Sequence, residues 1–457
     1  MPFEVVILAA GKGTRMRSKL PKVLHCVAGK PMVSHVIDSA ASLGAKAIHV
    51  VVGHGAETVK KHLSNQPSLR WAIQEQQLGT GHAVAQAMPN VDPESTVLIA
   101  YGDVPLVSSE TMSKLVAAAN DKVLSLLTVH MDNPSGYGRI VRNQSQQITS
   151  IIEQKDAQPE QLAITEVNTG ILAVSAKRLN QWLPKLSSEN AQGEYYLTDI
   201  ISMAVKDGMT VIAEHPASVM EVQGANNRQQ VSELERHYQH LKAQQLMVEG
   251  ATLIDPARVD VRGELSIGED IIIDVNCVFE GKVDIANDVK IGPNCIITNS
   301  SIGEGTVIKA NTIIEDSIVA KHCDIGPFAR LRPGSELSDR AKVGNFVETK
   351  KVKIGEGSKV NHLTYIGDCT IGQNANIGAG TITCNYDGAN KFLTTIGDNA
   401  FIGSNSSLVA PVTIGPGATI GAGSTISNDV NKQQLAVARS KQRNIDNWQR
   451  PVKIKKD

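Results

Sequence analysis

The sequence predicts two domains of different class, an α/β domain and a parallel β-helix of hexapeptide repeats, joined by a long helix. Three observations support this prediction. In residues 1–228, apolar strand-like runs alternate with helical patterns, the order typical of a mainly parallel α/β sheet. Residues 229–249 have the pattern of an amphipathic linker helix. In residues 250–457, aliphatic residues recur every six positions, which indicates short strands wound around a prism.

The α/β domain begins with the strand-like run VVILAA at residues 5–10. A helical pattern at 32–44, strands at 48–53 and 95–103, and a helix at 109–120 follow. Gly11 and Asp103 each follow a strand, and ligands of parallel sheets bind beyond the carboxyl ends of strands. The later runs at 136–142, 148–154 and 167–175 have no helices between them, so we expect antiparallel additions or a lid.

The linker helix is predicted from apolar residues spaced by three and four at Val231, Leu234, Tyr238 and Leu241. The helical pattern runs from Asn227 to Glu249, and at 1.5 Å per residue it extends about 35 Å. Gly250 follows it in the position of a helix stop.

The β-helix is predicted from long six-residue series of inward aliphatics, many of them followed by glycine. An α-helix is excluded because 3.6 does not fit a period of six and each glycine would cost about 1 kcal/mol. Two segments, 326–350 and 381–395, are expected to break the repeat, and breaks in a regular scaffold are where sites tend to be built. The series are Val261, Ile267, Ile273, Phe279, Ile285, Ile291 and Ile297; Ile302, Ile308 and Ile314; Ile354, Val360 and Ile366; and Ile396, Ile402, Leu408, Ile414, Ile420 and Ile426.

Composition limits the classes of partner. The net charge of the 457 residues is -1 with 20% charged residues, so no bulk field attracts nucleic acid or an anionic membrane. The six cysteines form no C-x-x-C pair, which argues against a disulfide framework or a zinc site. No run has the length of a membrane span or the pattern of a signal peptide. We therefore expect a cytoplasmic protein.

The loop LAAGKGTR at residues 8–15 ends the first strand in glycine, lysine and arginine. Such a turn offers backbone N–H groups and positive charge to a phosphate. It matches neither the Walker loop nor G-x-G-x-x-G, because Met16 stands where the third glycine would be. On spacing alone, a phosphate loop and an ordinary strand-to-helix turn both remain open.

Both halves together resemble the family of bacterial bifunctional N-acetylglucosamine-1-phosphate uridyltransferases and glucosamine-1-phosphate acetyltransferases. LAAGKGTRM with PKVLH at 21–25 is similar to the Rossmann-like sugar nucleotidyltransferases, and the repeats are similar to the left-handed β-helix acyltransferases. NFVETKK, GSKVNHLTYIGD and NIGAGTITCNYDGANK follow in order. The resemblance implies acetylation of glucosamine 1-phosphate by acetyl-CoA, then uridylyl transfer from UTP to N-acetylglucosamine 1-phosphate, feeding peptidoglycan and lipopolysaccharide synthesis. It also implies a homotrimer formed through the β-helix.

For uridylyl transfer, two polyanions must meet, so catalysis rests on positioning and charge neutralisation. Arg15 and Lys22 suit that work, and Asp103 suits Mg²⁺, although a helix cap is an equally good interpretation of Asp103. The resemblance adds Asn226 as a metal ligand, where the alternative is an N-cap of the linker helix. The implied UDP-N-acetylglucosamine contacts are Leu8, Ala9, Ala10, Gly11, Lys22, Gln74, Gly79, Thr80, Tyr101, Gly102, Asp103, Gly138, Glu153, Asn168 and Asn226.

For acetyl transfer, a base must take a proton from the amine, and His362 is the candidate because an imidazole titrates near neutral pH. The resemblance implies that Glu348 orients or polarises it, against the alternative of a solvated carboxylate. The implied sugar-phosphate contacts are Arg332, Lys350, Tyr365 and Asn376, and the implied acetyl-CoA contacts are Ala379, Asn385, Tyr386, Ser404, Ala422 and Arg439.

Two other functions are alternatives to the bifunctional enzyme. One is a nucleotide-sugar pyrophosphorylase whose β-helix serves only oligomerisation or allostery, which has no use for His362, Lys350 and the NYDGANK segment together. The other is a non-enzymatic sensor or assembly subunit, which would not need to keep Asp103 or Lys22.

Overall fold

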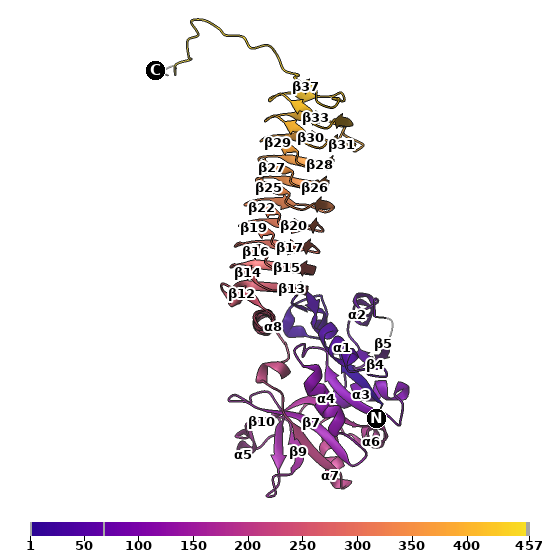
Figure 1. The fold of residues 1–457 in the computed structure, drawn as a ribbon. Helices are drawn as coiled ribbons and strands as arrows, with labels where there is room; N and C mark the ends of the chain where they lie inside the picture. Colours follow the sequence, from indigo (N-terminus) through magenta and orange to yellow (C-terminus); the bar gives the residue numbers. More distant parts are fainter. Residues whose placement is uncertain (1, 67–68, 454–457) are drawn as a thin grey trace. The chain divides into compact units, whose positions relative to one another are not determined.

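The computed structural model describes residues 2–66 and 69–453 and divides into two compact units, Met1–Leu241 and Lys242–Asp457 (Figure 1). Helix α8 (Arg228–Val248) crosses the division and confirms the predicted linker helix. Gly250, with φ near +110°, follows it in a conformation that favours glycine. No described helix combines the length and apolarity that a membrane span requires.

The sheet of the first unit has the order β11-β7-β10-β6-β1-β4-β5. Strand β1 pairs in parallel with β4 on one side and β6 on the other, so the strand order reverses at β1 and β6. The strands are β1 (Phe3–Leu8), β4 (Ile48–Val52), β5 (Leu69–Ile73), β6 (Thr96–Tyr101), β7 (Val123–His130), β10 (Glu166–Ser175) and β11 (Thr210–Glu214), with a separate hairpin of β2 (Cys26–Val27) and β3 (Lys30–Pro31).

Helices cover both faces of this sheet because its strands are apolar on both sides. Val5 and Ile7 pack with α1 (Met32–Ser42), α2 (Ala56–His62) and α4 (Ser109–Ala118). Val6 and Ile99 pack with α3 (Thr80–Ala87), α6 (Ala176–Trp182) and α7 (Asp199–Lys206). The predicted α/β class is confirmed.

The predicted antiparallel additions are also confirmed. Strand β10 pairs antiparallel with β6, β7 and β8 (Arg139–Arg142), and β8 pairs antiparallel with β9 (Ile148–Ile152). The short helix α5 (Pro159–Leu162) lies between β9 and β10 in the chain.

The second unit is a parallel β-helix whose coils form two long ladders (Figure 1). The first ladder contains β12 (Ala251–Leu253), β14 (Ile271–Ile273), β16 (Lys290–Ile291), β19 (Val307–Ile308), β22 (Asp324–Ile325), β25 (Lys342–Asn345), β27 (Lys359–His362), β29 (Asn376–Ile377), β32 (Phe401–Ile402), β35 (Thr419–Ile420) and β37 (Leu435–Ala436). The second contains β13 (Val259–Ile267), β15 (Cys277–Ile285), β17 (Ile296–Thr298), β18 (Ser301–Ile302), β20 (Ile313–Glu315), β21 (Ile318–Val319), β23 (Arg330–Leu331), β24 (Ser335–Leu337), β26 (Glu348–Ile354), β28 (Tyr365–Ile371), β30 (Ile382–Cys384), β31 (Thr394–Ile396), β33 (Ser407–Val409), β34 (Val412–Ile414) and β36 (Thr425–Ile426).

The six-residue series form the core of this unit, as predicted. Every member is buried except Ile267, which is partly buried against the same cluster. The column is closed at its first coil by Ala243 and Leu246 from the end of α8, which belong to the same core.

The prediction of a first break in the six-residue repeat is wrong. Within residues 326–350 the repeat continues through Leu331, Leu337 and Val343, all buried on successive strands. A five-residue step from Ile314 to Val319 shifts the phase of the series, and the glycine that marks other turns is missing after Leu331 and Leu337. The second expected break is real, because the chain leaves the coil after β30 and returns at β31.

Two adjacent residues test the inward and outward alternation of β17. The Ile297 side chain is fully buried, whereas Ile296 is 38% exposed. We expect Ile297→Ala to lower the free energy of unfolding of the β-helix by about 2–5 kcal/mol and Ile296→Ala by less than about 1 kcal/mol. Denaturant unfolding followed by circular dichroism measures both losses. Equal losses would contradict the register.

Candidate active sites

A cavity of about 380 Å³ lies in the first unit beyond the carboxyl ends of β1 and β6. The last residues of these strands, Leu8 and Tyr101, are register partners, so the loops that follow them meet at one edge of the sheet. This is the point where the strand order reverses, where parallel sheets bind ligands. The expected contacts that line the cavity are Leu8, Ala9, Ala10, Gly11, Lys22, Gln74, Gly79, Thr80, Tyr101, Asp103 and Asn226.

Oxygen and nitrogen atoms of four expected residues converge at one side of the cavity. The Lys22 ammonium forms an ion pair with the Asp103 carboxylate and donates to Asn226 Oδ1 at 3.3 Å. Arg15 Nη2 donates to the same Asn226 oxygen at 2.9 Å. A carboxylate, an amide oxygen and two cations therefore share one small region.

Ser108 and Asn227, not Asp103 and Asn226, cap the two helices that follow. Ser108 Oγ accepts from the backbone N–H of Thr111 and caps α4. Asn227 Oδ1 accepts from the backbone N–H of Gln230 at the start of α8. The capping interpretations of Asp103 and Asn226 are therefore wrong, and both side chains are available to the cavity.

The glycine loop owes its shape to Gly13 more than to Gly11. A Cβ on Gly11 would meet nothing within 4 Å, whereas a Cβ on Gly13 would lie 2.7 Å from Lys22 Cβ. Gly13 also has φ near +61°, a conformation that costs other residues energy. It therefore lets the loop approach the backbone of Lys22.

Four expected contacts do not line this cavity. Gly102 is packed beneath it, because a Cβ there would come within 3.4 Å of Val33, Val23 and Ala9. The other three form one neighbouring wall: Asn168 donates its backbone N–H to Gly138 O at 2.8 Å, and a Cβ on Gly138 would lie 3.3 Å from Glu153 Oε1.

Glu153 on this wall and the nearby Tyr101 both have raised pKa values. Burial, together with the nearby carboxylates of Asp156, Asp199 and Glu194, raises the pKa of Glu153, and a hydrogen bond from Thr198 Oγ1 at 3.1 Å partly offsets this. Burial, followed by the charges of Glu153 and Asp103, raises the pKa of Tyr101, so its hydroxyl stays protonated.

Sequence reasoning missed several residues of the cavity. Val23, Gln77, Ala83 and Glu194 also line it. Gln77 Nε2 donates to the backbone oxygen of Gln74 at 3.1 Å, and the Glu194 segment is joined to α3 by the bond from Gly81 N–H to Tyr195 O at 2.8 Å. Only the tertiary fold brings residue 194 to this loop, so no local signal predicts it.

The donor set favours a hard cation. Asp103 and Asn226 offer one carboxylate and one amide oxygen close together, which fits Mg²⁺ that takes its other ligands from phosphate and water. Across residues 2–66 and 69–453, no cluster of three or more His, Cys, Asp or Glu side chains is arranged to hold a metal.

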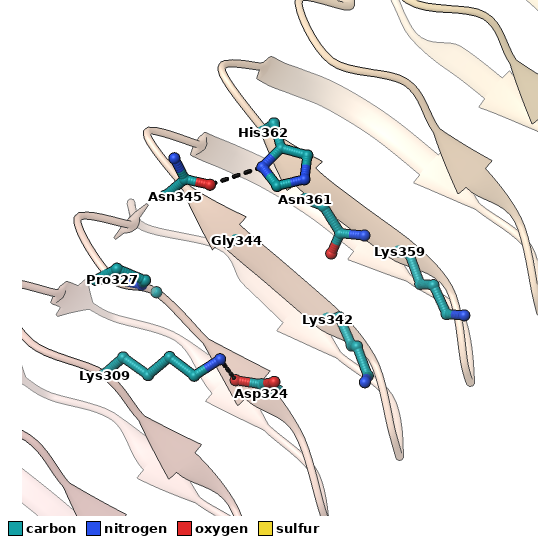
Figure 2. A pocket seen from close by; sticks show the side chains of 10 residues that line it. Lys309, Asp324, Pro327, Lys342, Gly344, Asn345, Lys359, Asn361 and His362 are labelled. Carbon is teal, nitrogen blue, oxygen red and sulfur yellow. Dashed lines mark hydrogen bonds and ion pairs between the residues drawn. The ribbon is translucent and has the colours of Figure 1, made fainter.

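In the second unit, a cavity of about 410 Å³ lies on the first ladder and includes His362 (Figure 2). His362 Nδ1 lies 2.7 Å from Asn345 Oδ1, and the two residues are register partners on β27 and β25. Because an amide oxygen only accepts, this contact places the proton on Nδ1 and leaves the lone pair on Nε2. Asn345 was not predicted.

Glu348 has a partner other than His362. Its Oε1 accepts from Arg332 Nη1 at 2.7 Å, so it is not the freely solvated carboxylate of the alternative interpretation. The neighbouring Lys350 has a lowered pKa, caused first by the charge of Lys391 and then by that of Arg332. The segment that leaves the coil after β30 thus adds an unpredicted third cation to the expected Arg332 and Lys350.

The expected acetyl-CoA contacts continue the column of His362. Ala379, Ser404 and Ala422 follow on successive coils, joined by hydrogen bonds from Asn405 N–H to Ala379 O and from Gly423 N–H to Ser404 O. Arg439 Nη1 donates to the backbone oxygen of Ala422 at 2.8 Å.

The remaining expected contacts of the acetyl site lie on three elements. Asn385 is buried and donates to Asp368 Oδ2, whereas Tyr386 is exposed on the segment that leaves the coil. Tyr365 begins β28 beside Glu348, and Asn376 lies on the first ladder in register with Lys359.

Comparison with known proteins covers both units. The MobA-like NTP transferase domain matches residues 5–160, the GMPPB C-terminal domain 261–354, and six bacterial transferase hexapeptide repeats 393–428. Among solved structures, a nucleotidyl transferase from Methanothermobacter thermautotroptrophicus is 20% identical, covers 52% of this chain and 97% of its own, and reaches a TM-score of only 0.38.

Curated relatives extend over the full length of the chain. "Bifunctional protein GlmU" of Cellvibrio japonicus is 60% identical over 451 residues, which are 99% of each chain. The proteins of the same name from Marinobacter nauticus and Pseudomonas putida are 60% identical over 99% of each chain and 59% identical over all of each chain. The resemblance identified from the motifs is thereby confirmed, and the chain belongs to the family of bifunctional GlmU proteins.

Proposed function

We propose that the chain is a bifunctional transferase that acetylates glucosamine 1-phosphate with acetyl-CoA and then transfers uridylyl from UTP to N-acetylglucosamine 1-phosphate, releasing pyrophosphate. The observation that carries this proposal is that one chain holds two separate cavities. One, at the sheet's point of reversal, places Lys22 beside the oxygens of Asp103 and Asn226, and the other, on the β-helix, contains the imidazole of His362. The first suits phosphate chemistry, and the second suits proton removal from an amine.

In the first cavity, the sugar phosphate attacks the α-phosphorus of UTP, and negative charge gathers along that line. Lys22 and Arg15 neutralise this charge and hold the two phosphates in position. Asp103 and Asn226 would hold the metal, which we propose to be Mg²⁺. Bound Mg²⁺ supplies positive charge to the phosphate oxygens. Gly138, Glu153 and Asn168, on the adjoining wall, are proposed to contact the sugar.

In the second cavity, His362 Nε2 takes the proton that the amine loses as it attacks the thioester carbonyl. The Nδ1–H group stays bound to Asn345 Oδ1, which fixes the orientation of the ring. Arg332, Lys350 and Tyr365 are proposed to bind the sugar phosphate, with Glu348 acting through Arg332. Asn385, Tyr386 and the column from Ala379 to Arg439 are proposed to bind acetyl-CoA.

We also propose which residues carry each activity, how many copies assemble and where the protein is located. The activities are assigned to residues 1–228 and 250–457, with 229–249 as the linker. The β-helix is expected to form a homotrimer, as the resemblance implies, and its flat outer faces are available to bind other copies. The substrates are cytoplasmic metabolites, so the cytoplasm is the expected location. A pyrophosphorylase with an inert β-helix is not favoured, because the cavity around His362 would then have no role.

The two activities should separate by mutation. His362→Ala is expected to lower acetyl transfer by roughly 10²–10⁴-fold and leave uridylyl transfer near normal. Asp103→Ala is expected to lower uridylyl transfer by roughly 100-fold or more and spare acetyl transfer. Thiol release and pyrophosphate release measure the two reactions. Acetylation at the wild-type rate in His362→Ala would show that another group is the base.

The contact between Asn345 and His362 predicts a change in pH dependence. In Asn345→Asp, a carboxylate beside Nδ1 stabilises the imidazolium, so the acid limb of kcat/KM for acetyl transfer should move to higher pH by roughly one unit. Asn361→Asp, in the same cavity but without a hydrogen bond to the ring, is the matched control with a smaller shift. Superimposable profiles for Asn345→Asp and the wild type would refute the contact's role.

The raised pKa of Glu153 predicts how stability depends on pH. The folded chain holds this proton more tightly than the unfolded chain, so stability falls as the pH rises through the folded pKa. Glu153→Gln should therefore melt at a higher temperature than the wild type at pH 8, with no advantage at pH below about 4. Thermal unfolding across pH tests this, and a variant less stable at pH 8 would contradict the electrostatic account.

A further inference from the structure

We infer that Lys342 and Lys359 form a phosphate-binding subsite in the same cavity as His362. The inference rests on the acetyl transfer proposed above and adds a subsite to it. Both side chains line the cavity on the first ladder and extend from neighbouring strands on its exposed face (Figure 2).

The register places two like charges directly beside each other. Lys342 on β25 and Lys359 on β27 are Cα partners, and neighbouring strands lie about 4.8 Å apart. Like charges at opposed positions of a ladder destabilise it. An anion held between the two ammonium groups reverses that effect, because each then forms a charge-assisted hydrogen bond.

The protein itself does not neutralise this pair. The nearest acidic residue in the column is Asp324, the register partner of Lys342 on the preceding coil. Its carboxylate is taken by Lys309, whose ammonium lies 2.6 Å from Asp324 Oδ1 (Figure 2). Within the described part of the chain, neither Lys342 nor Lys359 forms an ion pair with a carboxylate. The column thus contains a net excess of positive charge next to His362.

The spacing suits a phosphate ester that reaches the imidazole. Lys359 and His362 lie at the two ends of β27, so their Cα atoms are about 10 Å apart at 3.3 Å per residue. The Lys342 and Lys359 side chains extend away from His362 (Figure 2), so the ligand itself must span this gap. A long phosphate ester held on the lysine pair can place a reacting group at Nε2 within one cavity.

This subsite is distinct from the proposed Arg332 and Lys350 cluster. Lys350 lies on β26 of the second ladder, and Arg332 directly follows β23 of that ladder and donates its backbone N–H to Thr349 O, whereas Lys342 and Lys359 belong to the first ladder. The reaction has two phosphate-bearing substrates, the sugar phosphate and acetyl-CoA, so there is one phosphate-bearing substrate for each cation pair. The shared ligand chemistry is a phosphate group. Because the sugar phosphate is assigned above to Arg332 and Lys350, acetyl-CoA is the expected source of the phosphate group that Lys342 and Lys359 bind.

The test is acetyl-transfer kinetics of the full chain with Lys342→Gln and Lys359→Gln combined. The KM for one phosphate-bearing substrate should rise about tenfold or more, since two charge-assisted bonds are lost, with kcat within about twofold. A double Lys→Arg variant retains both charges and should stay within about threefold of the wild-type KM. Lys290→Gln is the matched control, because Lys290 lies in the same column but outside the cavity, and its kinetics should be unchanged.

The outcomes are distinct. A rise in the KM for the sugar phosphate assigns the subsite to that substrate, and a rise for acetyl-CoA assigns it to the acyl donor. Unchanged KM values for both, or a loss confined to kcat, overturn the inference.

Calorimetric titration with inorganic phosphate measures binding without catalysis. The double Gln variant should bind phosphate more weakly than the wild type, and equal binding counts against the subsite. A wild-type chain that binds phosphate but releases no thiol would refute the proposed acetyl transfer instead.

Discussion

The stacking of one inward aliphatic side chain on the next is the constraint on which the second unit depends. Because these side chains are buried on every coil, a slip of one residue would turn the apolar column outward. The register of the outward columns is therefore fixed as well. That register brings Asn345 beside His362 and Lys342 beside Lys359, so the chemistry of the cavity follows from the packing of the core.

In the first unit, a β-sheet forms the rigid apolar core in place of the column of stacked aliphatic side chains. Its sheet is apolar on both faces and covered by helices, so polar groups collect where the strands end. The reversal of strand order at β1 and β6 brings the glycine loop and Asp103 to one edge. Asn226 reaches the same place from the start of α8 because Asn227 performs the capping. Each unit thus builds its cavity at the boundary of a rigid apolar core.

Much of the fold was predictable because the spacing of the apolar residues along the sequence indicates which side chains are buried. The inward series and the linker helix were predicted from spacing, and the antiparallel strands were one of two alternatives suggested by the lack of helices between the later apolar runs. The continuation of the repeat through Leu331 and Leu337 was missed because a five-residue step changes its phase without a glycine to mark it. Residues that come to a cavity from a distant part of the chain were harder to predict. Asn345 reaches its cavity through the register of the coils, and Glu194 reaches its cavity through tertiary folding. Local sequence carries no signal for such distant pairs.

The central claim is that a single chain performs two chemically different transfers in two separate cavities. The most direct measurement is to incubate the protein with glucosamine 1-phosphate, acetyl-CoA, UTP and Mg²⁺ and to follow free thiol and pyrophosphate together. The account predicts that both are released, with thiol preceding pyrophosphate and UDP-N-acetylglucosamine as the product. Release of neither, or of pyrophosphate only when N-acetylglucosamine 1-phosphate is supplied ready-made, would contradict it.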